Sequence, residues 1–403
     1  MRRPFLFALI ALVVLQVAQA QPPALPRYGD APLEIASKRE WERRVRPAVL
    51  EFFTNEVYGK VPPTQPKVTF RLLNEGEAFG GKVLRREVEM LIGGTTKALV
   101  LIYLPRHHKG KVPVFLGMNF KGNHQISTDP AITISENAPK GKELKKYPPR
   151  GAAVARWPIE MITEAGYGVV TLYRGDIDPD FDDGFQNGIH PHFYAKGQSK
   201  PYANEWGTIG TWAWSLSRVM DYLTKVKDID HKRVVLFGHS RLGKTALWAG
   251  AQDKRFAIVI SNNSGCTGAS LSTNKQGETI AKINKLFPHW FCDNYLKYSN
   301  NEQALWIDQQ GLIALIAPRP VYVASASLDK WADPRNEFRS ALHASPVYKL
   351  YGKQGLSLTE MPAVGEADNE GSVAYHLREG KHNITAWDWA HYIRFANRHF
   401  FGK

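Results

Sequence analysis

One short segment near the middle of the chain constrains the fold more than any other feature of the sequence. Gly238-His239-Ser240-Arg241-Leu242-Gly243-Lys244-Thr245 follows the apolar run Val234 to Phe237 and precedes Ala246-Leu247-Trp248-Ala249. This pattern predicts a strand, a sharp glycine turn and a helix. Two catalytic signatures fit it. One is G-x-x-x-x-G-K-[ST], which holds nucleotide phosphates with backbone amides and Lys244; the other is a nucleophile elbow that displays Ser240.

The amino terminus helps to separate these two interpretations. Arg2-Arg3, the apolar stretch Phe5 to Val17 and Ala18-Gln19-Ala20 are the three parts of a secretory signal peptide, so residues 1–20 are expected to be removed. An uncleaved anchor is disfavoured because the apolar run is shorter than the ~20 residues that span a bilayer. We expect no membrane attachment after cleavage. The protein is then periplasmic or extracellular, where a nucleotide site would lack its substrate.

Residues 21–403 are expected to form a single catalytic domain. The chain has 403 residues, of which 43% are hydrophobic and 22% charged, enough for one large core with elaborated loops. The net charge of +14 falls to about +12 when Arg2 and Arg3 leave with the signal. Lys and Arg are dispersed apart from a short lysine cluster at 140–146, so the charge favours an acidic polysaccharide or solubility over nucleic acid. We expect a monomer.

The only two cysteines, Cys266 and Cys292, leave two possibilities open. In an exported protein a disulfide is permitted, and chain-entropy arithmetic gives it about 3.5 kcal/mol of stabilisation. Two buried free thiols are the alternative, because spacing alone does not show that the Cβ atoms meet.

Apolar runs along the chain predict antiparallel strands first and a parallel, helix-covered sheet afterwards. The polar loops 123–151 and 175–204 are long enough to form part of a binding surface or lid. We therefore expect an α/β-hydrolase fold: a three-layer sandwich with a mostly parallel central sheet, antiparallel N-terminal strands and long active-site loops. The expected strands are 68–72, 86–90, 99–103, 113–117, 167–172, 234–237, 256–261, 320–325 and 373–377, and helical spacing is present at 212–226 and 387–400.

A serine hydroxyl acts as a nucleophile near neutral pH only with a base and an orienting carboxylate. In α/β-hydrolases these residues follow in the order Ser, acid, His, each on a loop after a strand. Asp329 lies just beyond the strand 320–325, and His382 lies between the last strand and the last helix. Asp333 is an alternative acid, although the proline after it favours a turn or helix cap. The other histidines of this region are expected to be surface or capping groups: His376, His391 and His399.

The nucleotide interpretation makes no use of Asp329 and His382. It does find a possible magnesium aspartate in Asp176 or Asp178, because both follow an apolar strand. The compartment and the triad order outweigh that observation. A serine mechanism requires no metal and no organic cofactor.

At this point the residues resemble the glucuronoyl esterases of carbohydrate esterase family 15. Residues 238–244 look like that family's serine motif, in which an arginine follows the nucleophile and a lysine lies four places beyond it. The resemblance implies a bacterial-type serine esterase of the α/β-hydrolase superfamily. Its substrates would be the 4-O-methyl-glucuronoyl esters that link glucuronoxylan to lignin alcohols. Further matching segments are 56–59, 175–180, 261–265, 287–291 and 380–383.

The same resemblance implies roles for four more residues. Arg241 would stabilise the oxyanion, where loss of one donor typically costs about a hundredfold to a thousandfold in rate; the alternative is an arginine that bridges the elbow helix to a carboxylate. Lys244, Glu278 and Trp331 would hold the glucuronate sugar through its hydroxyls and ring face. Glu278 could equally be a helix-start residue, and Trp331 simple core.

One position departs from the family pattern. Many members carry the catalytic acid on a glutamate where this chain has Asn263, so the acid would have to come from Asp329. Two alternative functions therefore stay open. One is an acetyl xylan or other carbohydrate esterase with the same triad, and the other is an inactive polysaccharide-binding relative, for which Asn263 is the best evidence.

Overall fold

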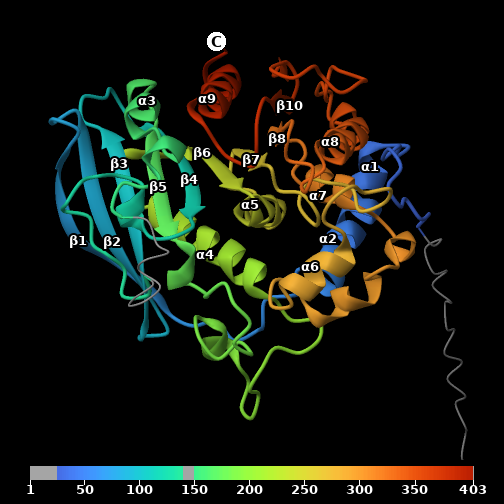
Figure 1. The fold of residues 1–403 in the computed structure, drawn as a ribbon, viewed down its shortest axis with the longest axis horizontal. Helices are drawn as coiled ribbons and strands as arrows, with labels where there is room; N and C mark the ends of the chain where they lie inside the picture. The colour runs from blue at the N-terminus through green and yellow to red at the C-terminus, as the bar shows by residue number, and fades with distance from the viewer. Residues whose placement is uncertain (1–24, 139–148, 403) are drawn as a thin grey trace, which may run out of the picture.

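A single mixed sheet forms the centre of the molecule in the computed structural model, which describes residues 25–138 and 149–402 (Figure 1). The predicted signal peptide and the lysine cluster at 140–146 lie outside the described residues. The strand order is β1-β2-β3-β5-β4-β6-β7-β8-β10-β9. The strands are β1 (Val68–Ala78), β2 (Val83–Ile92), β3 (Thr96–Pro105), β4 (Val112–Asn119), β5 (Gly168–Tyr173), β6 (Ile229–His239), β7 (Ile258–Asn262), β8 (Val321–Ala326), β9 (Ala367–Asp368) and β10 (Val373–Arg378).

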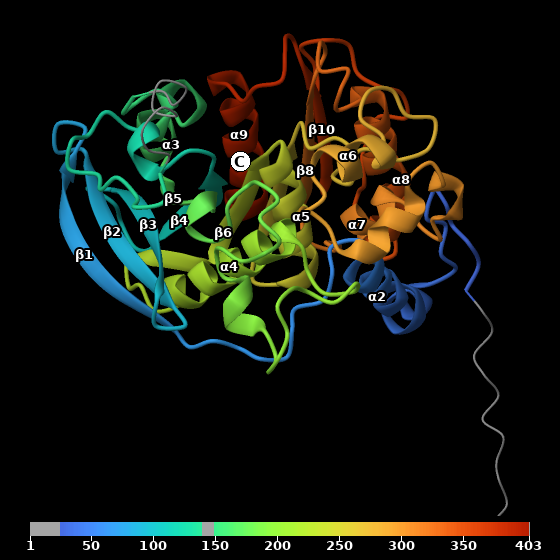
Figure 2. The ribbon, with the colours of Figure 1, turned by 60° about the horizontal axis from the view of Figure 1, so that its bottom comes forward.

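The strand directions agree with the prediction of antiparallel strands followed by a parallel sheet. β1, β2 and β3 pair antiparallel in sequence order, and β3 pairs antiparallel with β5. β5, β4, β6, β7, β8 and β10 then run parallel to one another, and the short β9 closes the far edge antiparallel to β10. Figure 2 shows β1 to β3 at one end of the molecule and β8 and β10 with their helices at the other.

Helices cover both faces of this sheet, as expected for a three-layer sandwich. Alternate side chains of each strand point to opposite faces. Phe237 of β6 therefore belongs to a buried cluster with residues of α3 and α9, while Leu236 belongs to the other cluster, which includes residues of α4 and α5. Figure 1 shows α3 and α9 on one side of the strands and α4 and α5 on the other. The helices are α1 (Lys38–Glu40), α2 (Arg46–Glu56), α3 (Ile159–Glu164), α4 (Thr208–Leu223), α5 (Arg241–Gln252), α6 (Ile280–Leu286), α7 (Gln309–Ala314), α8 (Pro334–Lys349) and α9 (Ala386–Phe401).

Cys266 and Cys292 are buried free thiols, so the disulfide that the sequence permits is not formed. Burial raises the pKa of Cys266 to about 11 and that of Cys292 to about 12, which keeps both thiols protonated near neutral pH. Along the described part of the chain, no helix has the length and apolar character needed to cross a membrane.

Candidate active site

The turn between β6 and α5 has the backbone of a nucleophile elbow. Ser240 has φ 59° and ψ −132°, a conformation that costs a residue with a side chain about 1–3 kcal/mol. The turn is tight because a Cβ on Gly238 would collide with the Leu242 carbonyl, and one on Gly243 would come within 2.9 Å of Ser264 Cβ. The Ser240 amide donates to the Asn262 carbonyl of β7 at 2.8 Å. The sequence pattern therefore predicted this turn correctly.

Asp329 is the carboxylate in contact with the imidazole of His382. His382 Nδ1 lies 2.6 Å from Asp329 Oδ2, and Asn263 Nδ2 donates to the same oxygen at 2.8 Å. Burial raises the pKa of Asp329, but the hydrogen bond and charge of His382, together with the Asn263 bond, outweigh it and hold the pKa below its usual value. Asp333, the alternative acid, instead caps α8 by accepting from the Asn336 amide.

His382 lies next to the elbow that carries Ser240. The His382 ring centroid is 4.6 Å from that of His239, the residue before Ser240, and 43% of the His382 side chain is exposed. Within the described chain, no hydrogen bond joins the Ser240 hydroxyl to His382. Catalytic hydrogen bonds are often long without substrate and tighten in the complex. Burial, with the charge of His382, lowers the pKa of His239 to about 3, so His239 stays neutral.

Arg241 bridges the elbow helix to a buried carboxylate, which was one of the two alternatives for this residue. Its guanidinium bonds Asp180, and it lies 4.7 Å from the centroid of the Trp290 ring. Asp180 also accepts from Trp290 Nε1 at 2.7 Å, lies 3.0 Å from Arg174 and 3.2 Å from His289 Nε2. Burial raises the pKa of Asp180, but His289 and the two arginines hold it well below its usual range.

Asp180 is therefore an anionic anchor that fixes the guanidinium of Arg241, the residue that follows Ser240 in the chain. Asp180 ends the matching segment 175–180, and the sequence alone indicates no role for it. No local signal could reveal this role, because Asp180 and Arg241 lie 61 positions apart in the chain.

Lys244, Glu278 and Trp331 form one cluster on the β7–β8 side of the elbow. Lys244 Nζ lies 3.7 Å from Glu278 Oε2 and donates to the carbonyls of Ser264 and Cys266. The Glu278 amide donates to the Trp331 carbonyl at 3.1 Å. Burial lowers the pKa of Lys244, opposed by the nearby Glu278.

The contacts of this cluster argue against the two structural alternatives, which were Trp331 as a core residue and Glu278 as a helix-capping residue. Trp331 is 48% exposed, so it is not core, and the side chain that caps α6 belongs to Thr279 rather than Glu278. Asp176 and Asp178, the possible magnesium ligands of the nucleotide interpretation, both bond other parts of the protein. Asp176 accepts from the Leu99 amide and Asp178 from the Thr208 hydroxyl, contacts that fasten the 175–204 loop.

A buried ion pair organises the loop that carries His382. Arg378, at the end of β10, donates to the carbonyls of Glu379, Lys381 and Asn383 at 2.6, 2.9 and 3.0 Å. Its Nε lies 3.0 Å from the fully buried Asp388 of α9. The guanidinium thus holds the backbone on both sides of His382. The sequence did not reveal this role, because an arginine after a strand is usually solvated.

Asp388 also reaches the strand that follows the elbow. It accepts from Asn262 Nδ2 at 3.3 Å, and Asn262 Oδ1 lies 2.5 Å from His239 Nδ1. His376 bonds the same carboxylate at 2.9 Å and is fully buried, so the prediction that it is a surface or capping group is wrong. Its ring fits the core because the carboxylate satisfies its nitrogen. One buried network therefore connects the serine turn to the histidine loop.

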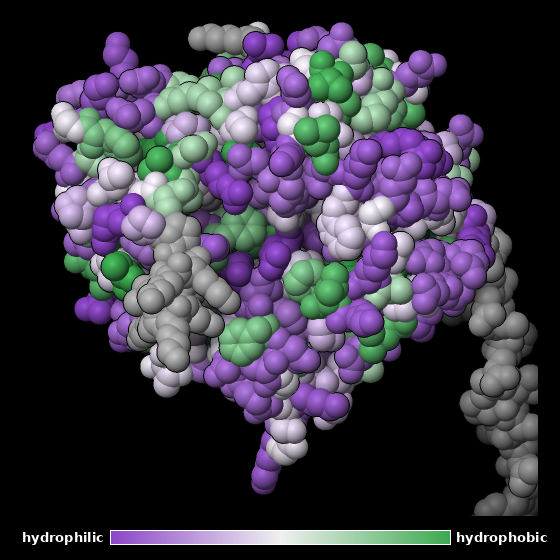
Figure 3. All heavy atoms as spheres, in the orientation of Figure 1, coloured by the Kyte–Doolittle hydropathy of each residue, from purple (hydrophilic) through white to green (hydrophobic). Residues whose placement is uncertain are grey.

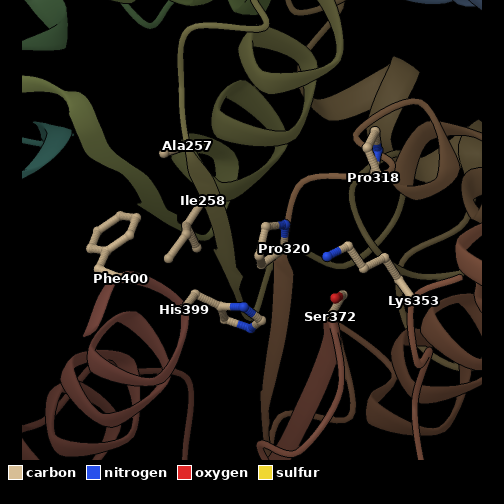
Figure 4. A pocket seen from close by; sticks show the side chains of 8 residues that line it. All are labelled: Ala257, Ile258, Pro318, Pro320, Lys353, Ser372, His399 and Phe400. Atoms are coloured by element: carbon tan, nitrogen blue, oxygen red, sulfur yellow. The ribbon is translucent and has the colours of Figure 1, made fainter. Parts of the chain in front are cut away.

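A cavity lies away from these residues. It has a volume of about 210 Å³ and is lined by Ile258, Pro320, Lys353 and His399, among others (Figure 4). Ile258 and Pro320 stand at the amino ends of β7 and β8, whereas the catalytic candidates follow the carboxyl ends. The cavity is thus at the opposite edge of the sheet. Among the described residues, no group of three or more His, Cys, Asp or Glu side chains could hold a metal ion.

Comparison with known proteins gives one consistent family. Residues 122–352 match the family model described as glucuronyl esterase of fungi. A carbohydrate esterase designated MZ0003, from an unknown prokaryotic organism, is 45% identical over 92% of this chain and 87% of its own length. A glucuronoyl esterase structure from Solibacter usitatus has a TM-score of 0.85 and 40% identity, covering 94% of this chain and 99% of the other. The 4-O-methyl-glucuronoyl methylesterase 1 of Phanerochaete chrysosporium is 27% identical over 64% of this chain and 54% of its own.

Proposed function

The chain belongs to the glucuronoyl esterase family, carbohydrate esterase family 15, and on that premise we propose that it hydrolyses esters of the glucuronic acid carboxyl group. The substrates would be the 4-O-methyl-glucuronoyl esters that join glucuronoxylan to lignin alcohols. The strongest support is the 2.6 Å contact between His382 Nδ1 and Asp329 Oδ2, beside a serine held at φ 59°. That arrangement provides a base whose tautomer is fixed by the carboxylate, close to a half-buried serine at the elbow.

In the proposed mechanism, Ser240 Oγ attacks the ester carbonyl while His382 Nε2 removes its proton. Asp329 orients the imidazole through Nδ1 and stabilises the imidazolium that forms. The Arg241 guanidinium, fixed by Asp180, faces the negative charge that develops on the carbonyl oxygen. His382 then gives the proton to the leaving alcohol. Water, activated by the same imidazole, breaks the acyl bond to Ser240 and releases glucuronate.

Asn263 supports this assignment of the acid rather than an inactive protein. The Asn263 side chain donates a hydrogen bond to Asp329 at 2.8 Å. Asn263 therefore supports the Asp329 carboxylate and does not itself take the place of the catalytic acid. A donor to a carboxylate stabilises the ionised form, which is the form that must orient His382. The chain thus keeps an anionic acid although the glutamate of many relatives is absent.

Lys244, Glu278 and Trp331 are proposed to hold the glucuronate sugar. Lys244 and Glu278 provide a buried donor and acceptor for hydroxyls, and the half-exposed Trp331 ring offers an apolar face to a sugar ring. Figure 3 shows apolar side chains scattered among hydrophilic ones over the visible surface. The signal-peptide pattern of residues 1–20 supports export to the site where plant polysaccharides are met.

A substrate panel tests the proposal. Residues 21–403 are purified and assayed with methyl 4-O-methyl-glucuronate and with acetylated xylan at equal concentrations of ester. We expect a higher kcat/KM for the glucuronate ester and no release of methanol by Asp329→Ala above about one thousandth of the parent rate. A preference for acetylated xylan would instead identify an acetyl esterase. Sugar binding without turnover of either ester would identify an inactive relative.

A further inference from the structure

Trp331, one of the three residues proposed to hold the glucuronate sugar, lies on one of two loops that are closely bonded to each other. The Gln276 amide donates to Asp333 Oδ2 at 2.9 Å, and the Glu278 amide donates to the Trp331 carbonyl at 3.1 Å. The loops approach so closely that a Cβ on Gly277 would lie 2.6 Å from the Trp331 Cα. The backbone of Trp331 is therefore fixed relative to Glu278.

The indole ring of Trp331 has fewer contacts than its backbone. Trp331 is 48% exposed, and among the described residues its ring stacks on no other aromatic ring and its Nε1 makes no hydrogen bond. The charged group that lies over the ring is Lys282, whose Nζ is 5.4 Å from the ring centroid. Within the described part of the chain, Lys282 thus makes the one polar contact of this ring.

Lys282 is itself fastened to the same pair of loops. It lies in the first turn of α6, where its amide donates at 3.3 Å to Thr279 Oγ1, the helix cap. Its Nζ donates to the Gly277 carbonyl at 2.7 Å. Gly277 is the residue that packs against the Trp331 backbone. The ammonium is therefore held in place over the indole ring and does not move freely in solvent.

We propose that Lys282 is a positioning residue of the sugar site, whose ammonium holds the Trp331 ring in the orientation that receives the glucuronate ring. The inference rests on the proposed esterase function and on the place of Trp331 in the sugar site. A cation over the face of an indole ring is attracted by the ring quadrupole. Without Lys282 the exposed ring would occupy several rotamers, and ordering it would oppose sugar binding. Lys282 acts on substrate binding through Trp331, so its loss should change KM rather than kcat.

The test uses methyl 4-O-methyl-glucuronate, an uncharged ester, so that direct attraction between the lysine and the substrate plays no part. Residues 21–403 are the parent, with the variants Lys282→Met, Lys282→Gln and Lys282→Arg. Glutamine can still donate to the Gly277 carbonyl but carries no charge, whereas arginine keeps a cation that stacks on aromatic rings. Lys285→Met, at an exposed position of the same helix, is the matched control. Circular dichroism and the melting temperature show that each variant is folded.

Lys282→Met and Lys282→Gln should each raise KM about fivefold with kcat changed less than about 1.5-fold. Lys282→Arg should restore most of the parental KM, and Lys285→Met should leave both constants unchanged. In a Trp331→Ala background, Lys282→Met should raise KM no further, because the two changes act through one ring.

Three results would overturn the inference while leaving the esterase function intact. They are a parental KM in folded Lys282→Met or Lys282→Gln, a loss of kcat in place of the change in KM, and the same rise in KM with and without the Trp331 ring. Absence of parental turnover of the ester would refute the esterase function and the inference with it.

Discussion

Replacing Arg378 with methionine should lower the stability of the protein and displace His382, the proposed catalytic base. Arg378 holds the loop that carries His382 in place, because its guanidinium donates to three carbonyls of that loop and pairs with the buried carboxylate of Asp388. Methionine fills much of the same volume but offers no donor. The substitution therefore removes the polar contacts while it limits the loss of packing.

The structure sets the size of the expected effect. Removing one partner of a buried ion pair usually costs 3–5 kcal/mol, since the other charge stays buried. Asp388 keeps donors from His376, Asn262 and Thr385, so we expect the lower end, about 3 kcal/mol. The three released carbonyls allow His382 to move, and a displacement near 1 Å can cost about a hundredfold in rate.

Urea unfolding and steady-state kinetics on methyl 4-O-methyl-glucuronate measure the two effects separately. We expect kcat to fall about a hundredfold with KM changed less than about threefold, because the proposed sugar-binding residues are not altered. Arg378→Lys keeps the charge but lacks the planar fork, so it should recover part of the stability and little of the rate. A folded Arg378→Met protein with nearly parental kcat would refute the role given to this network.

Three other substitutions test separate parts of the account. Asn263→Asp places a second carboxylate against Asp329, which should raise the pKa of the pair and move the acid limb of the kcat/KM profile to higher pH, whereas Asn263→Ala should not. Burial raises the pKa of Glu337 from 4.5 to about 7, so the folded state holds a proton that the unfolded state loses. Parental stability should then fall as pH rises between about 4.5 and 7, and Glu337→Gln should remove that decline in urea titrations. Trp331→Ala should raise KM for the methyl ester about tenfold, or ~1.4 kcal/mol, with kcat retained, and an unchanged KM would remove Trp331 from the sugar site.

Much of the fold could be predicted because the central strands are apolar on both faces. Residues 234–237, 256–261 and 320–325 are continuous hydrophobic runs bounded by polar loops, and each corresponds to a parallel strand, β6, β7 or β8. The elbow was equally clear, since only glycine fits at Gly238 and Gly243. The position of β5 between β3 and β4 was not predicted, because strand order depends on contacts between distant segments.

The candidate site likewise contains some residues that the sequence predicts and others that only the fold reveals. The order of Ser240, Asp329 and His382 followed from the α/β-hydrolase pattern, and the structure brings Asp329 and His382 into contact. Residues that act through a partner elsewhere in the chain were missed. Asp180 reaches Arg241 across 61 positions, and Asn262 reaches Asp388 across 126. No periodicity or local motif records such pairs, so only the folded geometry reveals them.

The most direct measurement of the central claim is the rate of methanol release from methyl 4-O-methyl-glucuronate by the parent protein and by Ser240→Ala. The hydroxyl is the only group that the proposed mechanism allows to form the acyl bond, so its removal should lower kcat at least about ten-thousandfold in a folded protein. Mass spectrometry of the parent, quenched during turnover, should find the added glucuronoyl mass on the peptide that contains Ser240. Retention of more than about a tenth of the parental kcat by Ser240→Ala would contradict the account.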